Sequence, residues 1–400
     1  YSATLTHFFL MHLNQGKNMK MTARKPRIAL MTSAIDGRMA KGTAIVARKC
    51  VEALLEHRDE FELTFIHYEK CDDPIYRHGV REVILPEFRS RFLNRRSIRQ
   101  IYYFLTTQDS FDIIHWFQPR VYPFFWRAPA RHIVVTVHGA GDLGKENHFV
   151  LSRLIFNGTL KLFKSRVAIA IVGSHYARND IITQYGFSPA QARVIHNGVD
   201  PLFSPASAQK VESVKKRYHL PDTFFLNVGR LIPGKNVLRV LRAFERFCFS
   251  FPESTIHFVN IGAKGSEKPL IDELIDKSRF KDRIHLVGYV EEEDLPAVYT
   301  AGFALVFPLL NEGFGLPVIE AMACGTPAII SQTATPEFTD RDAILVDALS
   351  EESIASGMRE MASNPPLRNT LIGQSLACAK RFSWDETGSK LITIYKEIVR

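Results

Sequence analysis

The sequence predicts an α/β protein built from two Rossmann-like, doubly wound domains with parallel sheets. Its 400 residues are too many for one ordinary core and suit two domains of about 150–200 residues each. Short apolar runs alternate with helically spaced apolar residues along the chain, and repeated βα units of this kind imply parallel sheets. The alternation restarts near residue 222, after a Pro- and Ser-rich stretch at Asn197–Ala208 that is typical of a linker.

In the first half, five short apolar runs are expected to be strands. Ala47, Cys50, Val51 and Leu54 follow the first run with helical spacing. Ser174 follows the last run and is placed to cap a helix. The five expected strands are Arg27–Ser33, Phe61–Ile66, Asp112–Trp116, His132–Val137 and Ala168–Val172.

The second half repeats this pattern. Val237, Val240, Leu241 and Phe244 mark a helix after the first of its strands. The expected strands are Thr223–Val228, Ile256–Ile261, Ile284–Val287, Ala304–Phe307 and Ala328–Ile330. In doubly wound sheets ligands lie beyond the carboxyl ends of the strands, and the motifs described below fall at such ends.

These patterns place one domain at residues 25–200 and the second at residues 201–383. Residues 1–24 are expected to be a disordered or expression-derived extension. Their short apolar run, Phe8–Met11, has its basic residues after it rather than before it, which is a poor match to a signal peptide.

The composition is that of an ordinary soluble globular protein, with 46% hydrophobic and 23% charged residues. No apolar run reaches the roughly 18 residues needed to span a membrane. Five scattered cysteines without C-x-x-C spacing favour a reducing cytoplasm and argue against a zinc site. Residues 1–200 hold 28 Lys and Arg against 17 Asp and Glu, whereas residues 201–400 hold 23 against 25. The basic first half is therefore expected to meet something anionic.

The most informative motif is NEGFGLPVIEAMACGTP at residues 311–327, which directly follows an expected strand. Gly313 and Gly315 allow the backbone to approach a ligand closely, and the next proline suits the first turn of a helix. The free N–H groups at such a helix start favour a phosphate or a sugar hydroxyl. Glu312 and Glu320 could each accept hydrogen bonds from hydroxyl groups, so the motif predicts a polyol ligand.

Two glutamates separated by seven residues inside EGFGLPVIEAMACGTP resemble the signature of the retaining nucleotide-sugar glycosyltransferases of family four. These enzymes have the GT-B fold, in which two Rossmann-like domains face each other across a cleft. The resemblance runs from about Arg27 to the chain end. It implies that Glu320 holds the donor ribose and that Glu312 holds the donor sugar. The loop between them is implied to bind the donor sugar and phosphate through Gly313, Phe314, Gly315 and Leu316.

A second motif, NVGRLIPGKN, begins at Asn227 and again follows an expected strand. Arg230 ends the strand and Lys235 is expected to open a helix, so two cations could bracket a diphosphate. The segment resembles the family pattern VGRL-x-x-x-KN, which carries Arg230 and Lys235 over as diphosphate ligands. Gly234 departs from the acidic residue that the family usually has there.

Two weaker motifs lie in the first domain. His138 follows a strand in VTVHGAGD, where the family often has a His beside the donor sugar; a structural histidine is the alternative. Gly42, in RMAKGTA, resembles the family's glycine loop, with Ala44 replacing its second glycine. A phosphate contact and a plain surface turn both remain open there. The candidate catalytic residues are His138, Glu312, Arg230 and Lys235.

Three further segments match the family. Gly288 and Tyr289 end a strand at the point that lies against the nucleobase in family members. The segment IHNGVD, which ends at Asp200, resembles the family's hinge. Trp384 resembles the start of the last family helix, so residues 384–400 are implied to cross back to the first domain.

The stretch FRSRFLNRRSIRQIYYFL at residues 88–105 is both basic and amphipathic. On a helical wheel Ile98, Ile101, Tyr102 and Leu105 share one face. Such a helix suits an anionic membrane surface, and a core helix with a solvated arginine face is the alternative. The residues expected at an acceptor or membrane surface are Arg91, Arg95, Arg96, Arg99 and Trp126.

The resemblance implies a retaining hexosyltransferase for mannose or glucose that uses a donor of the GDP-mannose or UDP-glucose type. The expected acceptor is a glycan or a lipid-linked sugar in cell-surface polysaccharide or lipopolysaccharide synthesis. The expected location is the cytoplasm, at the inner face of the membrane if the basic helix binds lipid. No metal, other cofactor or nucleic acid is implied. A nucleotide-sugar epimerase or phosphorylase on the same fold, and a non-catalytic sugar- or lipid-binding protein, are the alternatives.

Overall fold

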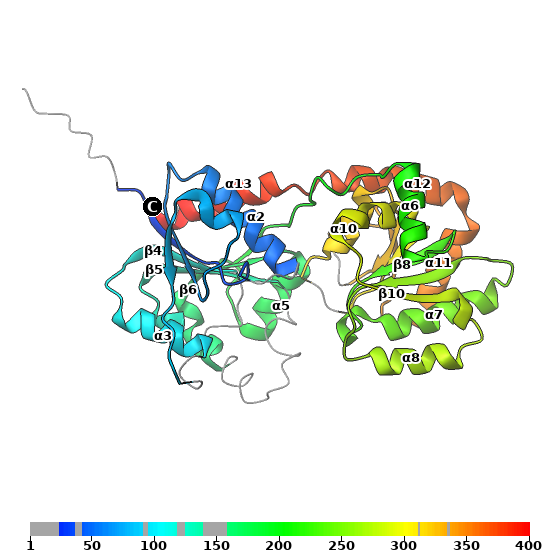
Figure 1. The fold of residues 1–400 in the computed structure, drawn as a ribbon, viewed down its shortest axis with the longest axis horizontal. Coiled ribbons are helices and arrows are strands. Elements are labelled where there is room, and N and C mark those ends of the chain that lie inside the picture. The colour runs from blue at the N-terminus through cyan, green and yellow to red at the C-terminus, as the bar shows by residue number, and fades with distance from the viewer. Residues whose placement is uncertain are drawn as a thin grey trace, which may run out of the picture.

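The chain forms two lobes, each built on one parallel β-sheet, as the sequence predicts (Figure 1). The computed structural model describes residues 24–36, 42–90, 95–117, 125–138, 158–310, 313–333 and 337–400.

The N-terminal sheet has seven parallel strands in the order β3-β2-β1-β4-β5-β6-β7. Its order reverses between β1 and β4, as in a doubly wound sheet. The strands are β1 (Arg27–Met31), β2 (Glu62–His67), β3 (Arg81–Ile84), β4 (Phe111–Trp116), β5 (Ala130–Val137), β6 (Val167–Val172) and β7 (Ala192–Val194).

Helices cover both faces of this sheet. Helix α2 (Gly42–Glu56) packs on one face together with the last helix of the chain, α13 (Trp384–Val399). Helices α3 (Arg96–Thr106) and α5 (His175–Tyr185) pack on the other. Short 3-10 turns are η1 (Pro74–His78), η3 (Phe125–Arg127) and η5 (Lys164–Arg166).

The C-terminal sheet has six parallel strands in the order β10-β9-β8-β11-β12-β13, which is again doubly wound. The strands are β8 (Phe224–Val228), β9 (His257–Ile261), β10 (Ile284–Gly288), β11 (Ala304–Phe307), β12 (Ala328–Ser331) and β13 (Ile344–Val346).

Helices α7 (Val237–Ser250), α8 (Lys268–Lys277) and α11 (Glu351–Ser363) cover one face of this sheet. Helices α6 (Ala208–Tyr218), α9 (Leu295–Ala301) and α10 (Leu316–Ala323) cover the other. Helix α12 (Pro365–Ala379) contributes to both cores. The 3-10 turns are η6 (Pro233–Lys235), η7 (Lys281–Arg283) and η8 (Glu292–Asp294).

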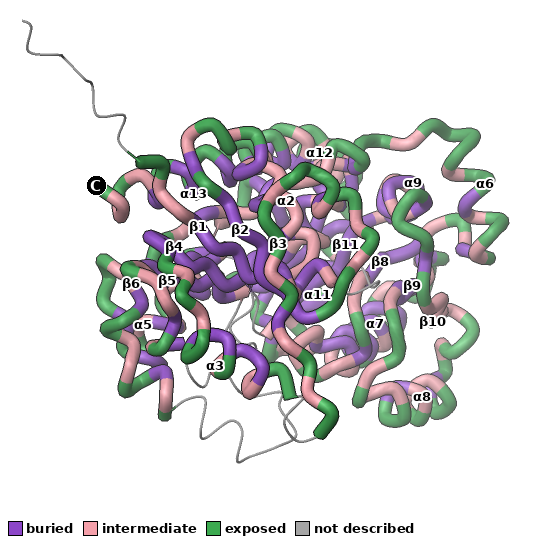
Figure 2. Tube along the Cα trace, turned by 60° about the vertical axis from the view of Figure 1, so that its left-hand side comes forward, coloured by how far each residue is buried: buried purple, intermediate pink, exposed green. Residues whose placement is uncertain are grey.

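The central strands are buried on both faces, which explains their continuous apolar sequences (Figure 2). All ten expected strands are present, with ends displaced by no more than two residues. Strands β3, β7 and β13 were not expected. All three are edge strands; β3 is largely exposed, and β7 and β13 have only three residues each.

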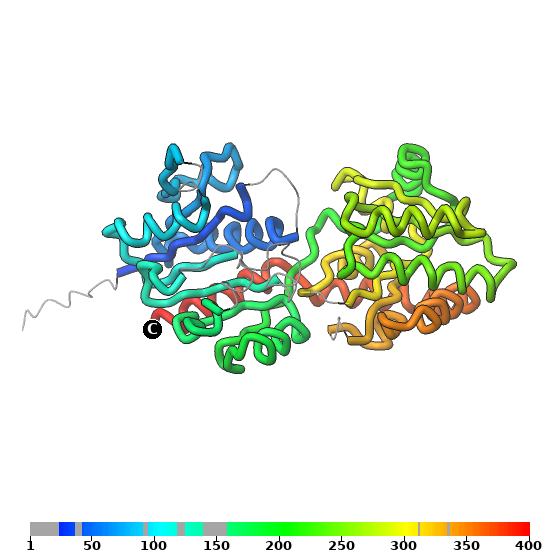
Figure 3. Tube along the Cα trace, turned by 90° about the horizontal axis from the view of Figure 1, so that it is seen from below, coloured from blue at the N-terminus to red at the C-terminus, as the bar shows by residue number. Residues whose placement is uncertain are grey.

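Helix α13 leaves the second lobe and runs back along the first (Figure 3). Its Leu391, Ile392 and Tyr395 are buried in the N-terminal core, where the Tyr395 hydroxyl lies 2.5 Å from His115 Nδ1. A side chain on Gly198 in the hinge would collide with the backbone of Trp384. The start of α13 is therefore packed tightly onto the segment that joins the domains.

Candidate active site

The carboxyl ends of the two sheets meet at the junction of the lobes, and two glycines bring the domains into contact there. A methyl group on Gly173, after β6, would lie 3.1 Å from both the carbonyl oxygen of Gly313 and Cβ of Phe314. A methyl group on Gly42, the first residue of α2, would lie 3.5 Å from Leu316 Cδ1. The loop before α10 thus packs against the first domain at positions where side chains are absent.

Helix α10 begins at this contact. Its N-cap, Gly315, has φ 85°, a left-handed conformation that favours glycine. Gly313, Phe314 and Gly315 are buried. The first N–H groups of a helix lack intrahelical acceptors and attract anions. Glu312, a candidate catalytic residue, lies outside the described residues.

Glu320 lies on α10 and accepts a hydrogen bond from the Tyr299 hydroxyl of α9 at 2.7 Å. Burial raises the pKa of Glu320 to about 7; the Tyr299 hydrogen bond opposes this rise, and the nearby Glu292 and Asp200 carboxylates add to it. The residue as a whole keeps some exposure, but its carboxyl group is desolvated. Burial therefore destabilises the ionised form of Glu320, and hydrogen bonds from hydroxyl groups of a ligand could offset that destabilisation.

Arg230 and Lys235 both follow β8. Arg230 is exposed, and the Lys235 side chain folds back over Gly229, with its Nζ 5.2 Å from the centre of the Phe307 ring. The expectation that Lys235 opens a helix is wrong, because it ends turn η6 and Asn236 separates it from α7. Asn236 has φ 59° and donates side-chain hydrogen bonds to the carbonyl oxygens of Pro308 and Ala348. Those bonds fix the backbone that carries Lys235.

Gly288 ends β10 and Tyr289 follows it, two strands from β8 in the same sheet. Tyr289 is 66% exposed, whereas Val290 beside it is buried in the core. An exposed aromatic ring at the carboxyl end of a parallel sheet can stack on a planar ligand. The predicted role of this residue pair at the nucleobase stays a prediction.

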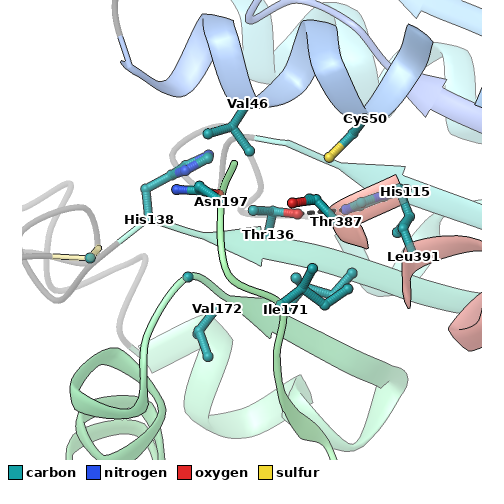
Figure 4. Close-up of a pocket in the computed structure, with 13 residues that line it drawn as sticks. Val46, Cys50, His115, Thr136, His138, Ile171, Val172, Asn197, Thr387 and Leu391 are labelled. Atoms are coloured by element: carbon teal, nitrogen blue, oxygen red, sulfur yellow. Dashed lines mark hydrogen bonds between the residues drawn. The ribbon is translucent and has the colours of Figure 1, made fainter. Parts of the chain in front are cut away.

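His138 directly follows β5 and lines a cavity of about 400 Å³ of empty space, part of it open solvent (Figure 4). Asn197 and Gly313 line the same cavity, which therefore reaches the domain junction. His138 Nε2 lies 2.7 Å from the Phe117 carbonyl oxygen, so one ring nitrogen is already occupied. The ring still lines the cavity, and its proposed contact with the donor sugar is untested.

His115 lies deeper in this cavity, and no motif in the sequence pointed to it. Its ring nitrogens lie 2.5 Å from the Tyr395 hydroxyl and 2.7 Å from Thr136 Oγ1. Burial, with a smaller contribution from His138, lowers the pKa of His115 to about 3. His115 is therefore a neutral residue that ties β4 to β5 and α13.

The basic helix α3 presents only part of its predicted cationic face. Arg95 and Arg96 are exposed, and the Arg96 guanidinium lies 5.1 Å from the centre of the Tyr68 ring. The surface placement of Arg99 is wrong. Its side chain is buried and donates hydrogen bonds to the carbonyl oxygens of Pro86, Tyr68 and Leu85. Arg91 lies outside the described residues.

Helix α3 fits the core-helix interpretation only in part, because Ile98 and Ile101 are half-buried and the rest of the predicted apolar face is exposed. Tyr102 is 46% and Leu105 65% exposed, whereas Tyr103 and Phe104 are buried in the core. Trp126, on η3, is partly buried and stacks on Phe163 with ring centres 4.0 Å apart. The exposed side of α3 thus combines two arginines with exposed apolar surface. Trp126 is partly buried against Phe163 instead of lying fully on the surface.

Comparison with known families covers both domains. Residues 40–202 match the model "Glycosyltransferase Family 4", and residues 209–375 match the model "Glycosyl transferases group 1". The two matches meet at the hinge and together take in most of the chain. They assign both lobes to one kind of enzyme, in agreement with the resemblance found in the sequence.

Curated relatives and solved structures agree with this assignment. The chain is 28% identical to the O-antigen chain mannosyltransferase B of Escherichia coli over 56% of this chain and 59% of that protein. It is 28% identical to the D-inositol 3-phosphate glycosyltransferase of Salinispora tropica over 72% of this chain and 64% of that protein. The alignments thus span less than two thirds of these relatives' own length.

The fold is that of solved GT-B structures. Anabaena HepE in complex with UDP-glucose superposes with a TM-score of 0.72 at 16% sequence identity, covering 93% of this chain and all of that one. In the part of the chain that the structure describes, no helix is long and apolar enough to cross a membrane.

Proposed function

The chain belongs to the GT-B glycosyltransferases of family four, and from this premise we propose that it transfers a hexose from a nucleoside-diphosphate sugar to an acceptor with retention of configuration. The observation that carries this proposal is the meeting of the α10 start with the first domain, at Gly173 and Gly42. A donor held on the second domain would there be presented directly to an acceptor held on the first.

The proposed donor site lies along the carboxyl edge of the second sheet. Arg230 and Lys235 are placed to bind the diphosphate, with help from the first turn of α10. Glu320 would accept hydrogen bonds from the ribose hydroxyls, and Tyr289 would lie against the base. Glu312 would contact the donor sugar, next to the buried backbone at Gly313.

In the proposed reaction, the acceptor hydroxyl oxygen bonds to the anomeric carbon as the bond from that carbon to the phosphate oxygen breaks. Negative charge develops on the departing diphosphate, where Arg230, Lys235 and the helix N–H groups would stabilise it. The acceptor attacks from the side of the leaving group, and its proton passes to a phosphate oxygen. His138 lines the cavity at the junction and would contact the donor sugar.

We infer a mannose or glucose donor. The Escherichia coli relative is named a mannosyltransferase, and the HepE structure holds UDP-glucose. These favour GDP-mannose and UDP-glucose as the first donors to test. We also propose that the reaction needs no metal ion, because the two cations and the α10 N-terminus can supply the positive charge around the diphosphate.

The exposed side of α3 supports a lipid-linked acceptor. Arg95 and Arg96 supply positive charge, and Tyr102 and Leu105 supply exposed apolar surface, although the Tyr102 ring also meets the Phe88 ring edge-on at 5.1 Å. This combination suits the anionic inner face of a cytoplasmic membrane, where lipid-linked sugars for polysaccharide or lipopolysaccharide synthesis would be presented.

A donor panel tests the proposal. The purified protein is incubated with GDP-mannose and UDP-glucose, with and without polyprenyl-diphosphate sugars, in buffer containing EDTA. We expect transfer from one donor, and NMR of the product should show the anomeric configuration of the donor. Product with inverted configuration would refute retention, and loss of activity in EDTA would refute metal independence. If neither donor shows transfer or even slow hydrolysis, the hexose assignment is refuted.

A further inference from the structure

A carboxylate from the second domain caps the start of a helix in the first domain. Glu337, in the loop between β12 and β13, accepts a hydrogen bond at 2.6 Å from the backbone N–H of His175, the first residue of α5. The Glu337 side chain is only 2% exposed. Ser174 already caps α5 by accepting from the N–H of Ala177. Glu337 therefore satisfies a second free N–H group of that helix start, from across the domain junction.

The hinge contributes a second group to this contact. His196 Nε2 lies 3.9 Å from Glu337 Oε1. The His196 ring also stacks on Phe314, with ring centres 5.9 Å apart, and meets Phe382 edge-on at 5.7 Å. His196 thus lies between the carboxylate and the loop that begins α10.

Within the described part of the chain, two polar atoms at this contact are buried without a hydrogen-bond partner, namely His196 Nε2 and Glu337 Oε2. Buried polar atoms are nearly always paired in folded proteins, because their lost hydration is otherwise uncompensated. A distance of 3.9 Å between the ring nitrogen and the carboxylate is one small domain movement away from a hydrogen bond. The described contact is therefore incomplete at His196 Nε2, and closer approach of the domains would bring that atom within hydrogen-bond distance of Glu337 Oε1.

From this geometry we propose that Glu337 is an interdomain latch, which holds the start of α5 and takes up the His196 N–H as the domains close. The latch would press the Phe314 loop against Gly173 and so position the donor for the acceptor. Glu337 is a positioning residue that acts through this loop. Its effect on turnover rests on the proposed transferase function, whereas the contact itself does not.

The charges around the latch favour a neutral imidazole as the donor. His175, Lys390 and Arg381 lie near His196 and oppose its protonation, whereas Glu386 favours it. Burial, followed by these cations, lowers the pKa of His196. Burial raises the pKa of Glu337, and the N–H of His175 opposes that rise. The Arg381 guanidinium forms an ion pair with the Asp342 carboxylate at 3.3 Å.

Hydrogen exchange of the nucleotide-free protein tests the contact. In Glu337→Ala the His175 amide loses its only described acceptor, and its exchange should quicken at least tenfold. Exchange at the end of α5, near Tyr185, should stay unchanged. Glu337→Gln keeps an acceptor oxygen and should restore protection. Glu352→Ala is the control, because Glu352 is an exposed carboxylate of the same domain, paired only with arginines there among the described residues. Unchanged exchange in Glu337→Ala, or an equal rise along all of α5, would overturn the latch.

Steady-state kinetics test the positioning role, using whichever of GDP-mannose and UDP-glucose supports transfer in the donor panel. We expect kcat to fall at least fivefold in Glu337→Ala while the donor KM stays within twofold, because the proposed donor contacts lie elsewhere. His196→Phe keeps the stacking on Phe314 and removes Nε2, so it should lower kcat by a similar factor. The double variant should lose no more kcat than either single variant. Unchanged kcat, or losses that multiply, would overturn the positioning role. The exchange result stands even if no transfer is found, so failure of the latch and failure of the proposed function are distinguishable.

Discussion

The Tyr299 hydroxyl donates a hydrogen bond to the Glu320 carboxylate at 2.7 Å, and both groups are withdrawn from water beneath the carboxyl edge of the second sheet. A single hydrogen bond does not compensate a buried charge, so the pKa of Glu320 is raised to about 7. The protein thus keeps a carboxylate in a position that does not favour its ionised form, which is typical of a functional site.

This pKa makes stability depend on pH. A folded-state pKa raised above the ordinary 4.5 gives stability that is complete below about pH 4.5 and is lost as pH rises through about 7. The loss amounts to up to ~3 kcal/mol at alkaline pH. Glu320→Gln cannot ionise, so its melting temperature should fall less than that of the wild type between pH 5 and pH 8. Thermal unfolding of both proteins checks this, with the exposed Glu212→Gln as control; parallel curves would contradict the assigned pKa.

Nucleotide binding should show the opposite trend. Ribose hydroxyls donate to an ionised carboxylate more strongly than to a protonated one. The affinity of the wild type for its nucleoside diphosphate should therefore increase between pH 6 and pH 8, and Glu320→Gln should bind more weakly without this increase. Calorimetric titrations at both pH values measure the effect. Equal pH dependence in both proteins would remove Glu320 from the ribose site.

The two cations after β8 offer a direct test of the diphosphate site. Losing one charge-assisted hydrogen bond to a desolvated phosphate costs about 1.5–3 kcal/mol, so Lys235→Ala should weaken nucleoside-diphosphate binding at least tenfold. Lys281→Ala is the matched control, because Lys281 is exposed and precedes β10 at the opposite edge of the sheet. Circular dichroism should show that both variants fold. An unchanged affinity of Lys235→Ala would refute the assignment.

The sequence predicted the central strands because strands buried on both faces have continuous apolar sequences. It did not predict β3, whose residues Arg81–Ile84 are mostly exposed, because an edge strand needs no such run. The start of α10 was predicted to within one residue, because Gly315 and Pro317 mark that turn locally. Glu337 and His175 are 162 residues apart, and no local pattern links them.

Helix α3 shows a different limit. Its sequence defines two faces, but which face the sheet covers depends on carbonyl groups elsewhere in the chain. The Arg99 guanidinium reaches the Tyr68 and Leu85 carbonyl oxygens, both at 2.6 Å, and this turns the apolar residues Tyr102 and Leu105 outward. Three carbonyl acceptors and the Glu87 carboxylate, which is 3.7 Å away, compensate the buried charge. These partners could be identified only in the folded chain.

Arg99 and Arg96, one turn apart, should therefore differ in their effect on stability. Arg99→Gln leaves buried carbonyl groups short of donors and should lower the free energy of unfolding by about 3 kcal/mol. Arg96→Gln alters an exposed side chain and should change it by less than about 0.5 kcal/mol. Urea unfolding of both variants decides this. Equal effects would mean that the Arg99 hydrogen bonds contribute little to folding.

The same helix provides the test of membrane binding. The variant Arg95→Gln/Arg96→Gln removes two exposed charges from α3. Each arginine near an anionic surface contributes about 1 kcal/mol, so the partition coefficient for anionic liposomes should fall about 30-fold. Leu105→Ser should reduce it further, because Leu105 is 65% exposed and would be buried in the lipid interface.

Arg242→Gln/Arg246→Gln removes the same charge from α7 of the other domain, where both arginines are partly exposed and contact Glu351. This control should float with the liposomes as the wild type does, because net charge alone does not orient a protein on a membrane. Flotation at low and high salt separates the electrostatic from the apolar contribution to membrane binding, since salt screens only the electrostatic one. If the wild type fails to float at low salt, or if both double variants lose binding equally, α3 is not the membrane-facing helix. The acceptor would then be expected to be a soluble glycan.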